Sequence, residues 1–185
     1  MKKIEKWRTL ESKEITKTHF FKLRSDRCEL PNKTIMPKYY VLEYSPWVNV
    51  VPITPDGQLV LIEQYRHASG EISIEIPGGM VDRGEEPIAA AARELAEETG
   101  YVAREIKFVN KQRPNPATQD NHLLTFVALG CELKKELCLD PFEDIRVFTK
   151  PILEVKKMVN QGVIDHSLII ASLCLCDAYL NSIPC

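Results

Sequence analysis

The sequence lacks a hydrophobic run long enough to cross a membrane. Its longest apolar stretch, residues 168–176, is interrupted by Ser172 and falls well short of the roughly 20 residues that a membrane-spanning helix needs. Lys2 and Lys3 near the start are not followed by an apolar segment of signal-peptide length. We therefore expect a protein that is not exported, does not bind a membrane and resides in the cytoplasm.

Disulfide and zinc signatures are also absent. The sequence contains 6 cysteines without a C-x-x-C pair, and a chain of 185 residues buries enough apolar surface to fold without disulfides. We expect free thiols in a reducing compartment. The alternative is a metal site built from cysteines. The sequence has neither the cysteine spacing of a zinc site nor a nearby histidine pair. The cysteines are Cys28, Cys131, Cys138, Cys174, Cys176 and Cys185.

The chain carries little net charge of either sign. Lys and Arg number 24 and Asp and Glu number 26, which gives a formal net charge of -2. This balance favours neither nucleic acid nor an anionic membrane as a partner. Affinity for a polyphosphate must therefore come from a local site or from a metal ion.

Length and composition favour one folded domain with an appendage. Of the 185 residues, 44% are hydrophobic and 27% are charged, as in ordinary globular proteins. Residues 20–30 and 34–44 are rich in aromatic and β-branched side chains and flank the turn sequence Pro31-Asn32-Lys33. We predict an N-terminal β extension over residues 1–45 and a larger domain over residues 46–185.

The larger domain shows strand and helix patterns that do not alternate strictly. A short helix is predicted between Pro87 and Gly100, and another after Pro151. Asp165 is expected to cap a last helix that extends to about Leu180. These patterns favour an α/β (α+β) fold in which helices cover a mixed sheet. The segments with strand patterns are residues 48–54, 58–65, 72–76, 105–110, 123–129 and 145–148.

The predicted helix that precedes Gly100 is unusually acidic. Glu94 and Glu98 are four residues apart, so their carboxylates project from one face, and Glu97 lies beside them. Arg93 is placed to pair with Glu97 one helical turn away. Like charges at this spacing repel each other, which suggests that the face has a function. The alternative is an ordinary solvated acidic surface that contains an Arg93–Glu97 ion pair.

A hard divalent cation would relieve this repulsion. Mg²⁺ prefers carboxylate oxygens and retained waters, and Mn²⁺ is the alternative ion. Gly78 and Gly79 allow the preceding backbone to come close, and a carbonyl there would complete the coordination shell. Such a site shields phosphate charge and activates a water, which is the chemistry of diphosphate hydrolysis.

The same residues belong to a longer pattern. Gly79 is followed after five residues by Glu85, and after seven more by the run Arg-Glu-Leu-Ala-Glu-Glu-Thr-Gly-Tyr that starts at Arg93. The pattern resembles the Nudix box and departs from it only at Tyr101, where the box has an aliphatic residue. The sequence from about Val48 to the C-terminal helix is thus similar to Nudix hydrolases.

Resemblance to Nudix hydrolases implies the family fold, an α/β/α sandwich around a mixed sheet. It also implies roles for the residues of the box. Arg93 would orient the carboxylates, Glu97 would take part in catalysis, and Glu85 would lie in the outer shell of the metal. The implied metal ligands are Gly78, through its carbonyl, and Glu94, Glu97 and Glu98.

Residues outside the box resemble the ADP-ribose and nucleotide-sugar pyrophosphatases of that family. The match comprises the segment that ends at Arg66, the segment that begins at Glu75, and Pro116, fifteen residues beyond the box. Arg66 would grip a diphosphate through two hydrogen bonds, and Glu75 and Pro116 would contact the substrate. Alternatively, Arg66 is a surface arginine and Pro116 an ordinary turn residue.

The N-terminal hairpin resembles the additional sheet with which such enzymes form a homodimer and close over the base. Phe20 is our candidate for stacking on the nucleobase, ahead of Tyr39, Tyr40 and Trp47. Each of these aromatic side chains has packing within the sheet as its alternative role.

The attacking water needs a base, and the resemblance points to the loop 140–144. Glu143 is our candidate for this base. One alignment of the loop places the family's glutamate opposite Pro141, so another residue or a metal-activated water is the alternative.

These residues together imply Mg²⁺-dependent hydrolysis of ADP-ribose, or of a related nucleotide sugar, to a nucleoside monophosphate and a sugar phosphate. GDP-mannose or another nucleotide sugar is the alternative substrate. The alternative functions are a nucleotide-sugar sensor without turnover and a hydrolase of nucleoside triphosphates. The complete set of carboxylates argues against the sensor, and the long N-terminal sheet argues against the triphosphate hydrolase.

Overall fold

The computed structural model describes residues 3–139 and 141–181, so Asp140 and Cys185 lie outside the described part. The cysteines within these ranges are free thiols. None of the helices within them is long and apolar enough to cross a bilayer.

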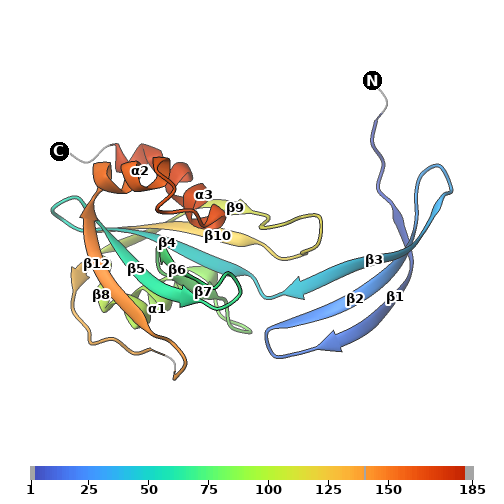
Figure 1. The fold of residues 1–185 in the computed structure, drawn as a ribbon, viewed down its shortest axis with the longest axis horizontal. Coiled ribbons are helices and arrows are strands. Elements are labelled where there is room, and N and C mark those ends of the chain that lie inside the picture. Colours follow the sequence, from blue (N-terminus) through green and yellow to red (C-terminus); the bar gives the residue numbers. More distant parts are fainter. Residues whose placement is uncertain (1–2, 140, 182–185) are drawn as a thin grey trace. The chain divides into compact units, whose positions relative to one another are not determined.

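The chain divides into two compact units, whose ribbon is drawn in Figure 1. Unit 1 comprises residues 1–45 and 113–122. Unit 2 comprises residues 46–112 and 123–185. The segment 113–122 therefore groups with the N-terminal extension, although the strands on either side of it belong to unit 2.

Unit 1 is built on a three-stranded antiparallel sheet of β1 (Arg8–Lys17), β2 (Phe21–Glu29) and β3 (Ile35–Tyr44), in that order. The predicted hairpin of β2 and β3 is confirmed, and its turn contains Lys33 in the left-handed region, with φ of 69°. The strand β1 was not predicted. Its side chains are almost all exposed, so it lacks the alternation of apolar and polar residues that marks a half-buried strand.

The segment 113–122 is fastened to β3 by hydrogen bonds. The Leu42 amide donates to the Thr118 carbonyl at 2.8 Å, and the Asp120 amide donates to the Leu42 carbonyl at 3.2 Å. The Tyr39 hydroxyl adds a bond of 2.6 Å to the Ala117 carbonyl. These bonds explain why the segment, which contains no regular strand, belongs to unit 1.

Unit 2 contains a mixed sheet, as predicted. Its strands follow the order β12-β5-β4-β10-β9, with β6 paired to β5 and β7 paired to β4. The pair β4–β10 is parallel and the other pairs are antiparallel. A small separate sheet pairs β8 (Tyr101–Val102) with β11 (Glu132–Leu133). The strands of the large sheet are β4 (Trp47–Ile53), β5 (Gln58–Arg66), β6 (Glu71–Glu75), β7 (Gly78–Met80), β9 (Glu105–Gln112), β10 (Leu123–Leu129) and β12 (Ile145–Pro151).

Helices cover both faces of this sheet. The helix α1 (Pro87–Thr99) buries Leu95 in a cluster with Val48 and Val50 of β4. The opposite face packs Val51 and Ile53 of β4 in a cluster with α2 (Ile152–Asn160) and α3 (Ser167–Leu175). Because successive side chains of a strand point to opposite faces, β4 contributes to both cores. The predicted α/β/α arrangement is therefore present in unit 2.

The C-terminal helix differs from the prediction. Asp165 does not cap it, because α3 begins at Ser167 with His166 in the capping position, and no side chain supplies a capping bond. The His166 carbonyl accepts bonds of 3.0 Å from the amides of Ile169 and Ile170, which fixes the start of the helix there. The helix ends before Cys176, and a short helix α4 (Asp177–Leu180) follows.

Candidate active site

The strand β7 brings the backbone of two glycines against the carboxylates of α1. The Gly78 amide donates a hydrogen bond of 2.9 Å to Glu98 Oε2. A Cβ at Gly79 would lie 2.4 Å from Glu94 Oε1, and a Cβ at Gly78 would lie 2.3 Å from the Val48 carbonyl oxygen. A side chain at Gly78 would collide with the backbone, and one at Gly79 would displace the Glu94 carboxylate, so the close approach predicted from the sequence takes place.

Arg93 holds the acidic residues around it. Its guanidinium donates to both oxygens of Glu85 at 3.0 Å, to Glu94 at 2.9 Å and to Glu97 at 3.1 Å. It also donates to the Met80 carbonyl at 3.1 Å, which ties α1 to β7. The predicted Arg93–Glu97 contact is therefore present. The Glu85 carboxylate is held by this arginine, whose hydrogen bonds lower the pKa of Glu85.

Glu98 carries the strongest electrostatic perturbation among the carboxylates of this cluster. Its side chain is buried, and burial raises its pKa to about 8, against the hydrogen bond from Gly78 and with the added repulsion of Glu94 and Glu143. Burial also raises the pKa of Glu94, although Arg93 acts in the opposite direction. The protein therefore holds two carboxylates where their negative charge is unfavourable.

The charge distribution fits a hard divalent cation. A cation between Glu94 and Glu98 would offset both the burial of these groups and their mutual repulsion. Among the residues that the structure describes, no three acidic, cysteine or histidine side chains already converge as a metal site. Glu94 and Glu97 instead direct an oxygen each at Arg93. Glu98, with its buried carboxylate, is the residue of this set whose chemistry most favours a bound metal.

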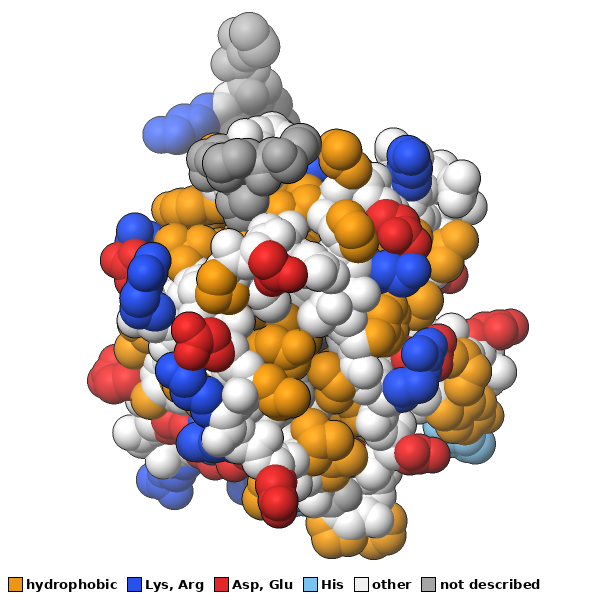
Figure 2. All heavy atoms as spheres, turned by 90° about the vertical axis from the view of Figure 1, so that its left-hand side faces the viewer, with side chains coloured by type: hydrophobic (Ala, Val, Ile, Leu, Met, Phe, Trp, Pro, Cys, Tyr) orange, Lys and Arg blue, Asp and Glu red, His pale blue; other side chains and the backbone are white. Residues whose placement is uncertain are grey.

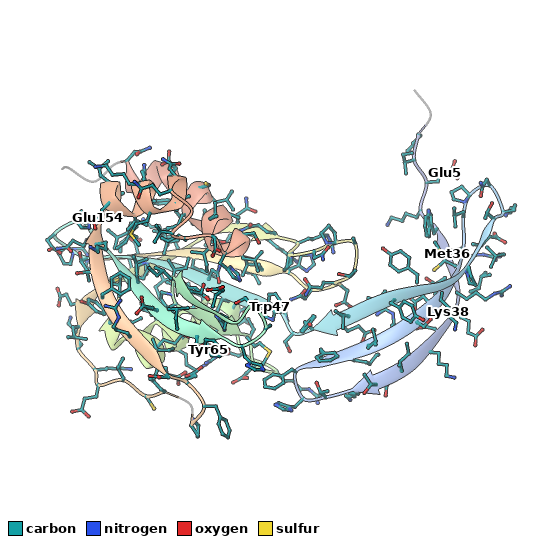
Figure 3. All side chains as sticks on the ribbon, in the orientation of Figure 1. Glu5, Met36, Lys38, Trp47, Tyr65 and Glu154 are labelled. Atoms are coloured by element: carbon teal, nitrogen blue, oxygen red, sulfur yellow. The ribbon has the colours of Figure 1, made fainter. Side chains whose placement is uncertain are left out.

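A cleft of about 820 Å³ lies beside the two glycines in unit 2. It is large enough for a nucleotide-sized ligand. Figure 3 labels Trp47, one of its lining residues. The polar and glycine residues among those that line it include Asn49, Arg66, Glu75, Gly78, Gly79 and His166. The structure thus places two predicted substrate contacts, Arg66 and Glu75, in one cavity with the backbone of β7.

Arg66 and Glu75 form a two-point ion pair across the β5–β6 hairpin. Arg66 Nε and Nη2 donate to the two oxygens of Glu75 at 2.8 and 2.7 Å. Burial raises the pKa of Glu75, but the bonds from Arg66 outweigh it and leave that pKa lowered. The predicted two-point grip on a diphosphate would therefore use the edge of the guanidinium that points away from Glu75.

Glu143 lies at the exposed end of the loop before β12. Its charge contributes to the raised pKa of both Glu94 and Glu98, so it is within electrostatic reach of the acidic cluster. The charge of Glu143 also acts on Arg66 in the cleft.

Phe20 and Pro116 both belong to unit 1. Phe20 is 54% exposed at the β1–β2 turn, where its ring lies 3.8 Å from the ring of His19 between centroids. Pro116 is exposed in the segment 113–122. Their roles as substrate contacts stay predictions.

Two lining residues of the cleft, Asn49 and His166, were not singled out from the sequence. Asn49 interrupts the apolar run Val48–Val51, and a lone polar residue in a buried strand is a signal that would have found it. The Nδ1 atom of His166 is buried without a hydrogen-bond partner in the described part of the chain. No comparable signal marks His166 in the sequence.

A smaller hollow of about 220 Å³ lies among α2, α3 and α4. Apolar side chains such as Val155, Val159 and Leu173 dominate its lining, which contains none of the predicted site residues. Figure 2 shows that hydrophobic side chains also gather in a band on one face of the molecule, between charged ones. Of the two cavities, the cleft beside β7 is therefore the one that contains predicted site residues, namely Arg66, Glu75 and Gly78.

We expect Gly79→Ala to weaken Mn²⁺ binding by roughly tenfold or more, because the new methyl group would displace the Glu94 carboxylate. The melting temperature should change little, since a side-chain end moves and the backbone does not. Gly78→Ala is the comparison, because its methyl group meets the Val48 carbonyl and should cost about 1–3 kcal/mol of stability. Titration followed by electron paramagnetic resonance, together with thermal unfolding, measures both. Unchanged Mn²⁺ affinity in Gly79→Ala would contradict this geometry.

Comparison with known protein families agrees with the arrangement of the site. Residues 43–166 match the model of the NUDIX domain. Residues 7–42 match the model of the nucleoside diphosphate sugar hydrolase N-terminal domain. The first match covers more than half of the chain and includes β7, α1 and most of the residues that line the cleft.

Individual proteins are similar over most of their length. The chain is 31% identical to the ADP-ribose pyrophosphatase of Bacillus subtilis, over 77% of this chain and 80% of that protein. It is 29% identical to the methanol dehydrogenase activator of Bacillus methanolicus, over 92% and 93%. A solved ADP compounds hydrolase, 22% identical, superposes with a TM-score of 0.85 over 98% of this chain and 97% of that one. The chain therefore belongs to the Nudix family and is a Nudix hydrolase.

Proposed function

We propose that this Nudix hydrolase cleaves the diphosphate bond of ADP-ribose, or of a related nucleoside diphosphate sugar, with Mg²⁺ as its cofactor. The products would be a nucleoside monophosphate and a sugar phosphate. The observation that carries the proposal is the buried Glu98 carboxylate beside a cleft that also contains Arg66. The names of relatives such as the B. subtilis ADP-ribose pyrophosphatase support this choice of substrate.

The residues of the cleft and the carboxylates of α1 have different roles in this proposal. Arg66 would hold a phosphate oxygen at the guanidinium edge that Glu75 leaves open, while Glu75 keeps the arginine in place. Glu94, Glu97, Glu98 and the Gly78 carbonyl would hold Mg²⁺. The ion would shield the phosphate charge and make a water more acidic.

Arg93 and Glu143 have separate roles in this proposal. Arg93 keeps Glu94 and Glu97 oriented through its hydrogen bonds. Its hydrogen bond to the Met80 carbonyl holds α1 against β7. Glu143 would accept the proton of the attacking water. Its electrostatic reach to Glu94 and Glu98 supports this role.

The substrate is tested by a panel of ADP-ribose, GDP-mannose, other nucleotide sugars and nucleoside triphosphates, each with Mg²⁺ or Mn²⁺. We expect the wild-type protein to release monophosphate fastest from ADP-ribose or another nucleotide sugar. Glu98→Gln should slow this release by several orders of magnitude, because it removes a metal-binding charge with little change of volume. Tight binding of ADP-ribose without release of monophosphate would replace the proposed function with that of a sensor.

Stability measurements show whether Glu98→Gln loses activity because a metal ligand is removed or because the protein unfolds. The pKa of Glu98 is about 8 in the folded protein against 4.5 for a free glutamate side chain, so ionisation favours the unfolded chain as pH rises above 4.5. The metal-free variant should therefore be at least as stable as the metal-free wild type at pH 7. The difference in stability between the variant and the wild type should vanish near pH 4.5, the pKa of glutamate in an unfolded chain. Thermal unfolding of both proteins at pH 7 and at pH 4.5 measures it.

Glu143→Gln tests the assignment of the base. The rate with ADP-ribose should fall by roughly 10²–10⁴-fold, the usual contribution of a general base, while Mn²⁺ affinity changes little. A rate within a factor of about two of the wild type would assign the proton transfer to another group.

We also propose that the chain forms a homodimer through the sheet of unit 1. Trp7, Phe20 and Tyr40 are 43%, 54% and 51% exposed there, and such exposed apolar side chains commonly mark an interface. Phe20 and Pro116 remain candidate substrate contacts in this proposal. A cytoplasmic location is proposed as well, on the argument from the cysteines of the sequence.

Sedimentation velocity of the full chain tests the dimer. The wild-type protein should sediment as a dimer, and Tyr40→Glu should shift it towards the monomer by placing a charge in the interface. Leu153→Glu, at a position of α2 that is 59% exposed, is the matched control and should leave the sedimentation coefficient unchanged. A monomeric wild-type protein would refute the proposal.

A further inference from the structure

Asn49 lines the cleft, and both protons of its side-chain amide form hydrogen bonds within the protein. Asn49 Nδ2 donates to Ser172 Oγ at 3.0 Å and to the Leu168 carbonyl at 3.3 Å. Both partners belong to α3, which packs on the sheet behind β4. The nitrogen end of the Asn49 side chain therefore faces the helix.

Ser172 fixes the direction of a longer hydrogen-bond chain. It is fully buried and donates its single proton to the Leu168 carbonyl at 2.9 Å. With that proton used for Leu168, the bond of 3.0 Å between Thr125 and Ser172 is donated by Thr125, although its geometry allows either hydroxyl as the donor. Thr125 in turn accepts a bond of 2.7 Å from Gln112 Nε2. The chain runs from β9 through β10 to α3, and each donor points the same way.

The acceptors on α3 decide which atom of the Asn49 amide faces away from the helix. An amide turned by 180° would direct its oxygen at the Leu168 carbonyl, which is also an acceptor. The oxygen instead lies against β7, because a Cβ built on Gly78 would be 2.8 Å from Asn49 Oδ1. In the described part of the chain no group donates a hydrogen bond to this oxygen. The cleft thus has a fixed acceptor beside the backbone that contacts Glu98.

We propose that Asn49 Oδ1 accepts a hydrogen bond from a sugar hydroxyl of the substrate, and that Ser172 and Thr125 are positioning residues for it. The inference rests on the proposed function. A phosphate oxygen carries no proton at neutral pH, so it cannot satisfy this acceptor. In a nucleotide sugar, each phosphate of the diphosphate is esterified directly to a sugar. The sugar hydroxyls are therefore the donors of the substrate that lie closest to its diphosphate, and Arg66 and Asn49 line the same cleft.

Two sugars offer such a hydroxyl, the ribose of the nucleoside and the second sugar. Competition with AMP against 2′-deoxy-AMP and 3′-deoxy-AMP tests the first, and ribose 5-phosphate against 2-deoxyribose 5-phosphate tests the second. In the wild-type protein, one of these series should lose about tenfold in affinity when the hydroxyl is removed, the usual contribution of one hydrogen bond. In Asn49→Ala, the hydroxyl and deoxy ligands should bind alike.

Kinetics distinguish binding from folding effects. Asn49→Ala should raise KM for the nucleotide sugar by about tenfold with a smaller change in kcat. Ser172→Ala should lower the preference for the hydroxyl ligand only in part, since Asn49 keeps its bond to Leu168. Thr149→Val, on the strand β12 at the other edge of the sheet, is the control and should leave the preference unchanged.

The outcomes separate this inference from the proposed function. If the wild-type protein hydrolyses no nucleotide sugar, the proposed function fails, while a hydroxyl preference that disappears in Asn49→Ala still supports the acceptor. If the wild-type protein hydrolyses nucleotide sugars and Asn49→Ala changes neither KM nor the hydroxyl preference, the inference is overturned. Thermal unfolding of each variant confirms that the comparison is made on folded protein.

Discussion

The close approach of the β7 backbone to the carboxylates of α1 is the constraint on which the site depends. The Gly78 amide reaches Glu98 at 2.9 Å, and Gly79 leaves no room for a side chain beside Glu94. A buried carboxylate is unfavourable by itself, and one backbone donor offsets only part of that penalty. The arrangement makes physical sense when the negative charge is needed for a bound cation.

Arg93 balances part of this concentration of charge. It contacts Glu85, Glu94 and Glu97, while Glu98 is held by the backbone instead. The carboxylate with the most strongly raised pKa is thus the one without an arginine partner. This division is expected for a site in which some groups are kept in position and one is kept ready to bind a metal.

Much of the fold followed from local patterns. The strand at 123–129 is a short, almost continuous apolar run, and the helix from Pro87 to Gly100 has an apolar stripe and end signals; both are present as expected. The strand β1 escaped prediction because its exposed, polar residues carry no periodicity. Asp165 was wrong as a helix cap, because several positions of that loop offer a polar residue and only packing selects one.

The sequence by itself determined that three carboxylates lie close together on one helix, because the spacing of Glu94, Glu97 and Glu98 requires no tertiary information. It also pointed to Arg66 and Glu75 as candidate substrate contacts. Only the tertiary structure decided that these two residues bond to each other and share a cleft with Asn49, since the partners come from different strands. The orientation of the Asn49 amide depends on Ser172, which is far away in sequence. Contacts between such distant residues arise from packing, which no local pattern encodes.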